Sequence, residues 1–371
     1  MRRRILLSAL LAGGALASLL GLRAPTAGAA PAAGFHALGD LPGGAFASRA
    51  LDLSADGRFV VGASIVDDAG REEGFRWDAE RGLVALGDLP GGARVSRATA
   101  ISGDGRVVVG TSQSVSGKEG FRWSTSEGML GLGDLPRGIF SNEALGVSHD
   151  GRVAVGVAQS IRGVRTWPRA FRWTADVGMV DLGTFEDGRP SSRATDVSAD
   201  GRAIVGSASS SRGRQAALWR EEEAIIGLGD LPGGAFDSRA LAIAPDASVV
   251  VGVGASRRGP EAFRWSARGP LRGLGDLPGG DHDSEALAVS LGGDRIVGRG
   301  TTERGDEAFL WSRKQGLRSL EQVARDAGLA IPEAWRLERA VAISDDGRTI
   351  AGTGTNPDGA REAWVIVLPG E

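Results

Sequence analysis

The sequence contains no cysteine, no tyrosine and only three histidines among its 371 residues. Without cysteine the chain can form neither disulfide bridges nor a lipid-modified cysteine, so its stability depends on the core alone. It also has no Gly-x-Ser-x-Gly elbow, no phosphate-binding P-loop and no His-Glu-x-x-His string. No common catalytic motif therefore assigns a reaction.

Long apolar runs are confined to the amino terminus. Residues 5–22 follow three arginines and precede small residues that end at Ala29, which is the pattern of a secretory signal. We predict a signal peptide over residues 1–29 and export to the periplasm or the extracellular space. The arginines leave the general secretory and the twin-arginine routes open, and an uncleaved anchor is a further alternative. No other run approaches the ~20 apolar residues that a spanning helix needs.

The chain also lacks an excess of positive charge. It has 43 basic and 46 acidic residues, and removal of residues 1–29 would leave 39 basic residues and a formal charge of −7. A nucleic-acid-binding domain would be basic, with clustered lysine and arginine. Nucleic acid is therefore excluded as a partner.

Glycine is abundant, with 59 residues, and punctuates a seven-fold repeat. The repeat is marked by anchor leucines spaced 46 to 50 residues apart, namely Leu38, Leu86, Leu132, Leu182, Leu228, Leu274 and Leu320. In its second copy the unit holds four short β runs, at residues 98–101, 106–111, 120–123 and 129–132, separated by Asp-Gly or Gly turns. Four antiparallel strands in a period of this length predict a propeller blade.

The two ends of the repeat array are complementary. The last unit stops at residues 364–368 without a fourth strand, and residues 34–39 carry the missing piece. We predict an all-β, seven-bladed β-propeller over residues 34–368, whose last blade is closed by the N-terminal strand. The expected blades are 50–86, 98–132, 144–182, 194–228, 240–274, 286–320, and 340–368 joined by 34–38. A ring closed in this way leaves no free sheet edge between its first and last blades.

The first strand of each unit, which would lie innermost, starts with an alanine, and the residue before that alanine is charged. These residues, five arginines and two glutamates, are Arg49, Arg97, Glu143, Arg193, Arg239, Glu285 and Arg339. They would ring one mouth of the central channel, where guanidinium groups suit carboxylates, sulfates and phosphates. The alternative is that the arginines pair with loop aspartates, at positions 40, 88, 230 and 276, and only tie blades together.

Three departures from the repeat mark further candidate sites. Blade 3 has a four-residue insertion that contains Trp167. The link into blade 7 is eight residues longer, with a predicted capped helix after Ser319 and then Trp335. Both tryptophans could stack on sugar rings or could pack their own loops down. In blade 6 a loop carries Asp281, His282, Asp283 and Glu285. These residues could bind a divalent cation or form a solvated polar loop.

The repeated Leu-Gly-Asp-Leu-Pro-Gly-Gly, Ser-x-Asp-Gly-Arg-x-Val-Val-Gly and Glu-Ala-Phe-Arg-Trp strings resemble the HAF family of extracellular bacterial repeats. The resemblance runs through all seven units and implies an exported, propeller-like protein. The family is named for a His-Ala-Phe string, and this chain has no histidine at that position. The residues there are Glu73, Glu119, Arg169, Gln215, Glu261, Glu307 and Glu362. The resemblance therefore carries over no functional histidine.

We expect a monomeric, noncatalytic binding or scaffolding propeller that needs no cofactor. Its partner would be an anionic polysaccharide or a cell-surface protein, bound at the arginine-rich face. The alternative is a polysaccharide-acting lyase or hydrolase with a site at blades 6–7. It would use the polar loop of blade 6, with the arginines of the channel mouth as charge stabilisers. Fold alone does not decide between them, because propellers host both binding proteins and enzymes.

Overall fold

The structure, a computed structural model, describes residues 30–221 and 223–370, so the predicted signal peptide lies outside the described residues. The described chain is all-β apart from helix α1 (Leu320–Asp326) and one 3₁₀ turn (Leu291–Gly293). Its strands fall into seven groups of four antiparallel strands, numbered here in chain order. No helix among the described residues is long and apolar enough to cross a membrane.

Each of the first six groups is a meander in which consecutive strands pair, and group 7 adds β1 to the meander β26–β28. The groups are β2–β5 (Ser48–Leu53, Val60–Ile65, Glu72–Asp78, Gly82–Ala85), β6–β9 (Gly91–Ile101, Val107–Ser114, Gly117–Ser124, Gly128–Gly131), β10–β13 (Gly138–Val147, Ala154–Arg162, Arg165–Thr174, Gly178–Asp181), β14–β17 (Ser192–Val197, Ala203–Ser210, Gly213–Arg220, Ile226–Gly229), β18–β21 (Gly233–Ile243, Val250–Ser256, Pro260–Ser266, Gly269–Gly275), β22–β25 (Ser284–Val289, Arg295–Thr302, Gly305–Ser312, Gly316–Ser319), and β26–β28 (Arg336–Ile343, Thr349–Thr355, Arg361–Val367) with β1 (Gly34–Ala37).

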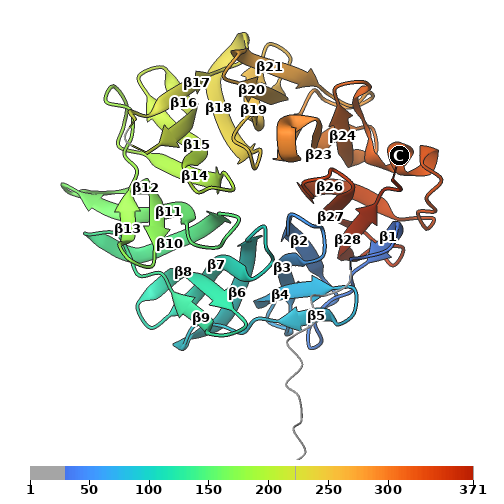
Figure 1. Cartoon of the computed structure of the whole chain (residues 1–371), viewed down its shortest axis with the longest axis horizontal. Coiled ribbons are helices and arrows are strands. Elements are labelled where there is room, and N and C mark those ends of the chain that lie inside the picture. Colours follow the sequence, from blue (N-terminus) through green and yellow to red (C-terminus); the bar gives the residue numbers. More distant parts are fainter. Residues whose placement is uncertain (1–29, 222, 371) are drawn as a thin grey trace, which may run out of the picture.

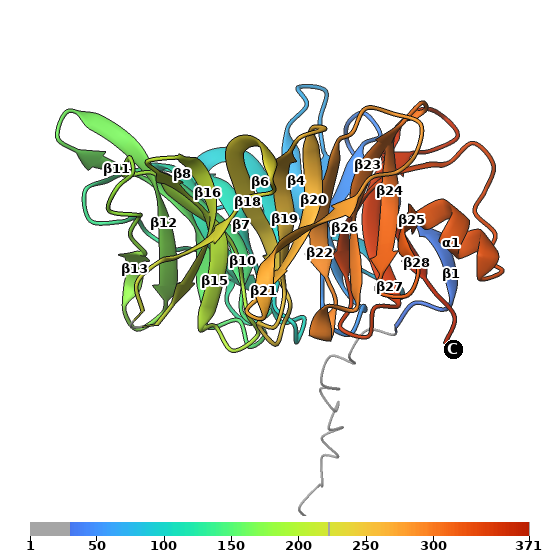
Figure 2. The same ribbon diagram turned by 90° about the horizontal axis from the view of Figure 1, so that it is seen from above.

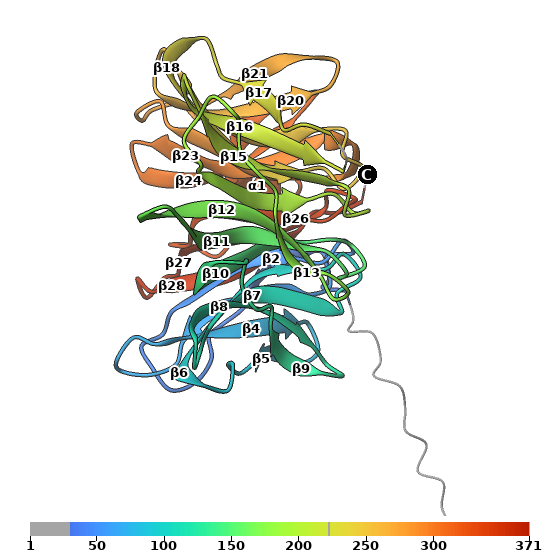
Figure 3. The ribbon, with the colours of Figure 1, turned by 90° about the vertical axis from the view of Figure 1, so that its left-hand side faces the viewer.

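The groups are arranged around a central axis, with the first strand of each group innermost (Figure 1). Seen from the side, the molecule is a disc with loops on both faces (Figures 2 and 3). Single parallel bridges, Ser141 to Lys118 and Arg214 to Asp237, join groups 2 and 3 and groups 4 and 5 into eight-stranded sheets. In group 7 the N-terminal strand β1 pairs antiparallel with β28.

Buried apolar side chains form one cluster at each contact between neighbouring groups. Phe75 and Trp77 of group 1, for example, pack in one cluster with Val365 of group 7. Trp77 and Trp219 are buried, and the other repeat tryptophans lie against such clusters. The tryptophans at the end of the third strand therefore pack between neighbouring groups in six units, at positions Trp77, Trp123, Trp173, Trp219, Trp265 and Trp311.

The glycine of the Val-Val-Gly string is required by a close approach between strands. A Cβ atom on Gly110 would lie 1.9 Å from the carbonyl oxygen of Arg97 on the inner strand. That distance is far inside van der Waals contact, so glycine lets the inner strand bulge against its neighbour. The register shift between Ala98 and Ala100 marks this bulge.

A small polar residue near the start of the inner strand links adjacent groups. Gly74 of group 1 donates its backbone N–H to Ser96 Oγ of group 2 at 3.0 Å. The same bond recurs from Gly120 to Asn142, Ala170 to Ser192, Ala216 to Ser238, Ala262 to Ser284, and Ala363 to Ser48. The last of these joins group 7 to group 1.

Some inner strands begin earlier than the sequence predicts. β6 starts at Gly91 rather than at Ala98, because the crossover from group 1 continues as strand and Gly91 lies opposite Ser114 of β7. β10 and β18 extend in the same way, whereas β2, β14 and β22 begin two residues before their alanine.

Candidate functional site

The residues of the predicted arginine rim lie on the inner strands, on the amino-terminal side of the alanine that recurs in each strand. We use "arginine rim" for Arg49, Arg97, Glu143, Arg193, Arg239, Glu285 and Arg339 with the side chains that they contact. Each of the five arginines has a carboxylate partner. The partners are Glu72, Glu143 and Glu285, and not the loop aspartates that the sequence suggested.

Glu72 begins β4 and receives two arginines from neighbouring groups. Its oxygens accept from Arg49 Nη2 at 2.5 and 2.6 Å, and from Arg97 Nη2 at 2.7 Å. Burial and the nearby Arg97 lower the pKa of Arg49. Two guanidinium groups thus share one carboxylate.

Glu143 and Glu285 repeat this arrangement. Glu143 pairs with Lys118 and lies 3.0 Å from Arg193 Nη2. Although burial opposes it, these two cations lower the pKa of Glu143. Glu285 lies 3.5 Å from Arg239 and 3.4 Å from Arg339, which belong to the two flanking groups. Every glutamate of the rim is therefore shared by at least two cations.

Two of the loop aspartates, Asp230 and Asp276, have a different role, because their carboxylates accept backbone N–H groups of their own crossovers. Asp230 accepts the N–H of Leu231 at 2.7 Å and of Asp237 at 2.6 Å. Asp276 does the same for Leu277 and Asp283. These bonds fix the conformation of the Leu-Pro-Gly-Gly turns. The rim arginines therefore pair with the glutamates and not with these aspartates.

The two candidate stacking tryptophans have different surroundings. Trp335 is 6% exposed and contacts Phe35 edge-on, with ring centroids 5.0 Å apart. A side chain so buried in the cluster beneath α1 offers no face to a sugar, so the ligand-binding assignment of Trp335 was wrong. Trp167 is half-buried in β12, opposite Ser160.

Three residues of the polar loop of group 6, His282, Asp283 and Glu285, contact side chains that can carry the opposite charge. His282 Nε2 lies 3.2 Å from Glu261, while Asp283 and Glu285 both contact Arg299, at 3.2 and 3.3 Å. Although burial opposes it, these two carboxylates raise the pKa of Arg299. Among the described residues no three His, Asp or Glu side chains gather as metal ligands. The structure therefore does not bring Asp281, His282, Asp283 and Glu285 together as a cation site.

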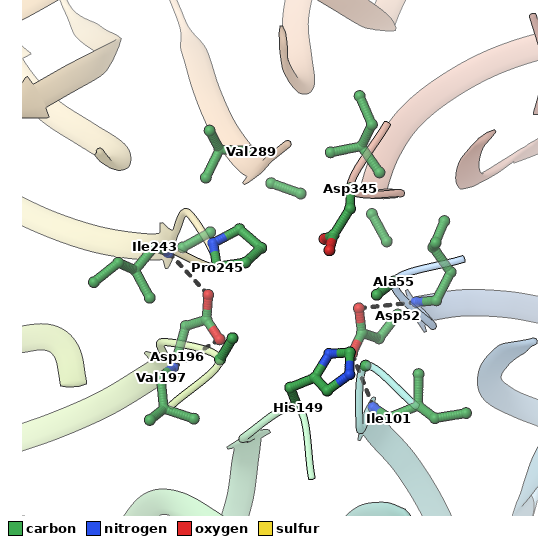
Figure 4. Close-up of a pocket in the computed structure, with 17 residues that line it drawn as sticks. Asp52, Ala55, Ile101, His149, Asp196, Val197, Ile243, Pro245, Val289 and Asp345 are labelled. Carbon is green, nitrogen blue, oxygen red and sulfur yellow. Dashed lines mark hydrogen bonds between the residues drawn. The ribbon is translucent and has the colours of Figure 1, made fainter. Parts of the chain in front are cut away.

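The opposite mouth of the axis holds a site that sequence reasoning missed. At the carboxyl-terminal ends of the inner strands a cavity of about 130 Å³ is lined by apolar residues with Asp52, His149, Asp196 and Asp345. These four side chains point toward one central space (Figure 4). Burial raises the pKa of Asp52 to about 7 and that of Asp196 to about 6.

Both carboxylates also tie neighbouring groups together. Asp52 accepts the N–H of Leu53 at 2.8 Å and that of Ile101 in group 2 at 2.9 Å. Asp196 bonds in the same way to Val197 and to Ile243 of group 5. With both oxygens occupied by backbone donors, these side chains serve as links between inner strands.

The turns that surround this cavity form a chain of backbone hydrogen bonds. The N–H of Asp345 in group 7 donates to the carbonyl of Ala55 in group 1 at 2.9 Å. Equivalent bonds run from Ala55 to Gly103, Asp104 to His149, His149 to Ala199, Ala199 to Pro245, and Leu291 to Asp345. The step from group 5 to group 6 has no such bond, because proline at position 245 lacks an N–H.

The sequence held a signal for this cavity. The second residue after the inner-strand alanine is alanine or glycine in five units and aspartate only at positions 52 and 196. Aligning the seven copies at that position would have singled out both aspartates.

Comparison with known proteins supports the fold. No family model matches the sequence, and no curated protein does. Among solved structures, the β-propeller domain of the trilobed protease from Pyrococcus furiosus, described as having an open velcro topology, is 9% identical with a TM-score of 0.52. That match covers 87% of this chain and 96% of that domain.

Two further structures give the same result. A chain of the mitotic checkpoint complex is 14% identical with a TM-score of 0.50, over 86% of this chain and 90% of that one. An acylaminoacyl peptidase is 11% identical with a TM-score of 0.52, over 84% of this chain. This chain spans about half the length of that peptidase, 51%. At such identities the likeness concerns the fold alone, and the fold is that of a β-propeller.

Proposed function

We propose that the chain is an exported, closed, seven-bladed propeller of the kind that the resemblance to HAF repeats implies. Closure is supported by the pairing of β1 with β28, by the bond from Ala363 to Ser48, and by the bond from Asp345 to Ala55. Glu362 also accepts the N–H of Gly39 at 2.9 Å. Export is supported by the signal-like residues 1–29.

The function that the geometry favours is noncatalytic binding of an anionic polysaccharide at the arginine rim. The observation that carries this proposal is the sharing of three glutamates among seven cations. The cations are Arg49, Arg97, Lys118, Arg193, Arg239, Arg299 and Arg339. Even when Asp283 and Asp306, which contact Arg299, are counted with the glutamates, the rim keeps two positive charges in excess.

The exposure of the rim fits an incoming polyanion. The side chains of Arg97, Arg193 and Arg239 are 48, 45 and 40% exposed, whereas those of Glu143 and Glu285 are 27 and 16% exposed. These two carboxylates thus lie deeper than the guanidinium groups of Arg97, Arg193 and Arg239. A polymer of carboxylates or sulfates would meet the arginines first and could bind several of them at once.

A binding module is favoured over the hydrolase form of the alternative. Glycoside cleavage needs one carboxyl group free to protonate and a second free to attack or to activate water. In the group 6 loop Asp283 and Glu285 are engaged by Arg299, and at the opposite mouth Asp52 and Asp196 are engaged by backbone N–H groups.

The test is binding of residues 30–371 to immobilised polysaccharides at low and high salt. Polygalacturonate and a sulfated dextran should bind at low salt and dissociate as salt rises, because the contacts are between charges near the surface. Neutral dextran should not bind. If neutral and anionic polymers bind equally, or if none binds, the rim is not a polysaccharide site.

A further inference from the structure

Two departures from the repeat meet at one groove in group 3. The groove is a cavity of about 540 Å³ between the crossover from group 2 and the β11–β12 hairpin. We name it the group 3 groove and define it by Leu135, Arg137, Ile161, Arg162, Met179 and Val180. Neither departure is needed by the scaffold, since the other groups close without them.

The first departure is Arg137, which follows Leu135 and Pro136 where sibling loops have glycine. Arg137 has φ 68°, inside the left-handed region. The corresponding residues of four sibling turns, Gly43, Gly91, Gly233 and Gly279, have φ between 81° and 123°. For an L-residue with a side chain, the left-handed conformation is roughly 1–2 kcal/mol less favourable than the right-handed one. Residues strained in this way occur more often at functional positions.

The second departure is the hairpin insertion, which lengthens β11 and β12. This hairpin projects beyond its neighbours in Figure 2. Its tip lies toward the start of the inner strand β10, because Gly138 of β10 pairs with Ser160 of β11. The N–H of Ile161 donates to the carbonyl of Arg137 at 3.1 Å, so the hairpin is fixed to the strained turn. The two departures are therefore one structural unit.

The walls of the groove combine an apolar floor with cationic flanks. Leu135 and Met179 are buried at its base, while Ile161 and Val180 are 42 and 48% exposed. Arg137 is exposed and contacts no carboxylate among the described residues. Arg162 reaches Asp181 only at 4.0 Å.

The acidic groups near the groove are already engaged. Asp181 makes a bidentate pair with buried Arg169, at 2.8 and 3.0 Å. Asp134 accepts the backbone N–H groups of Leu135 and Phe140, at 2.9 and 2.5 Å. The two guanidinium groups of Arg137 and Arg162 thus face the groove without a full counter-charge.

We infer that the group 3 groove docks an acidic peptide segment of a protein partner, with an apolar side chain on the floor and carboxylates on Arg137 and Arg162. An aliphatic floor suits Leu, Ile, Val or Phe side chains better than it suits a hydroxyl-rich sugar. Carboxylates match both guanidinium groups. This site is separate from the arginine rim.

The experiment is a selection of random peptides from a displayed library on immobilised residues 30–371. Enriched peptides should carry Asp or Glu within a few residues of a large apolar residue. Arg137→Gly should weaken binding of the best synthetic peptide about ten-fold or more, as expected for loss of a charged hydrogen bond. Because glycine suits φ 68°, this variant should unfold at the same temperature as the parent or higher, so that lost binding is not lost folding.

Arg162→Ala should weaken the same peptide, and the matched control Arg258→Ala, in the corresponding turn of group 5, should leave it unchanged. Polygalacturonate binding at the rim should be the same in Arg137→Gly and the parent. Three outcomes overturn the inference: no enrichment, enrichment of peptides without acidic residues, or equal peptide affinity in Arg137→Gly. Loss of polygalacturonate binding in that variant, with peptide binding intact, would assign the groove to polysaccharide instead.

Discussion

Asp52 of group 1 and Ile101 of group 2 are joined by a 2.9 Å hydrogen bond in which the backbone N–H of Ile101 donates to the carboxylate. The bond closes the gap between two inner strands at the mouth opposite the arginine rim. Asp196 and Ile243 repeat it between groups 4 and 5, also at 2.9 Å. In both places a titratable carboxyl group joins the inner strands of two neighbouring groups.

The stability of the fold should therefore depend on pH through Asp52. Burial raises its pKa from 3.8 to about 7, so between these pH values the folded chain binds more protons than the unfolded chain. The free energy of unfolding then falls as pH rises through this window, since each pKa unit corresponds to about 1.4 kcal/mol. Asp196 acts in the same direction up to about pH 6. His149 and Asp345 face the same cavity.

Asp52→Asn removes that titration and should flatten the profile. We expect the free energy of unfolding, measured with urea, to fall by a few kcal/mol in the parent between pH 4 and pH 8. In Asp52→Asn it should fall by less. The control is Asp68→Asn, on an exposed loop. Parallel profiles for the parent and Asp52→Asn would show that the carboxyl group titrates normally.

Trp335→Ala should destabilise the fold by about 3–5 kcal/mol, the usual effect of truncating a buried tryptophan. Trp335 packs against Phe35 of β1 and lies in the cluster beneath α1. Thermal unfolding measures the change, and polygalacturonate binding at a temperature where the variant is folded should persist. Trp167→Ala, at a half-buried position, serves as the comparison and should be much milder.

Removal of residues 30–38 should lower the unfolding temperature, because it takes away β1 and the buried Leu38. The exposed edge of β28 would then be free to pair. A synthetic peptide of residues 30–40, added in excess, should restore the temperature by binding in place of β1. A truncated chain that unfolds like the parent would argue against closure through β1.

Glu285→Gln should move binding and stability in opposite directions. Glu285 is 16% exposed and is shared by Arg239, Arg299 and Arg339. Its neutralisation should reduce the free energy of unfolding by only about 1–2 kcal/mol, because solvent screens the partly exposed arginines. The same change should strengthen polygalacturonate binding at low salt. Calorimetry and thermal unfolding measure the two effects, and weaker polysaccharide binding would contradict a cationic site.

The repeat made most of the architecture predictable from sequence. Asp-Gly turns, alternating apolar runs and the anchor leucines place the strands within a unit, because these signals are local. The helix capped by Ser319 follows from the same kind of signal, and Ser319 accepts the N–H of Gln322. The early start of β6 was missed because it depends on pairing of a crossover with its neighbour, which Gly91 alone does not reveal.

The sequence indicates the place of each rim residue within its unit but not the contacts that the residue makes. Arg97 meets Glu72, which belongs to the preceding unit, and Arg239 meets Glu285 of the following one. Such contacts depend on how neighbouring units pack, and spacing within a unit does not report them. The same reason hid Asp52, whose second hydrogen bond crosses to Ile101.

The most direct test of the arginine rim compares two double variants of residues 30–371 that remove the same charge from opposite faces. Arg97→Ala with Arg239→Ala takes two guanidinium groups from the rim. Arg106→Ala with Arg152→Ala takes two from turns at the other mouth, where their side chains are 84 and 85% exposed. We predict that polygalacturonate binding at low salt falls at least ten-fold in the first variant and stays unchanged in the second. Equal binding by both variants, or an equal loss in both, would contradict a site at the rim.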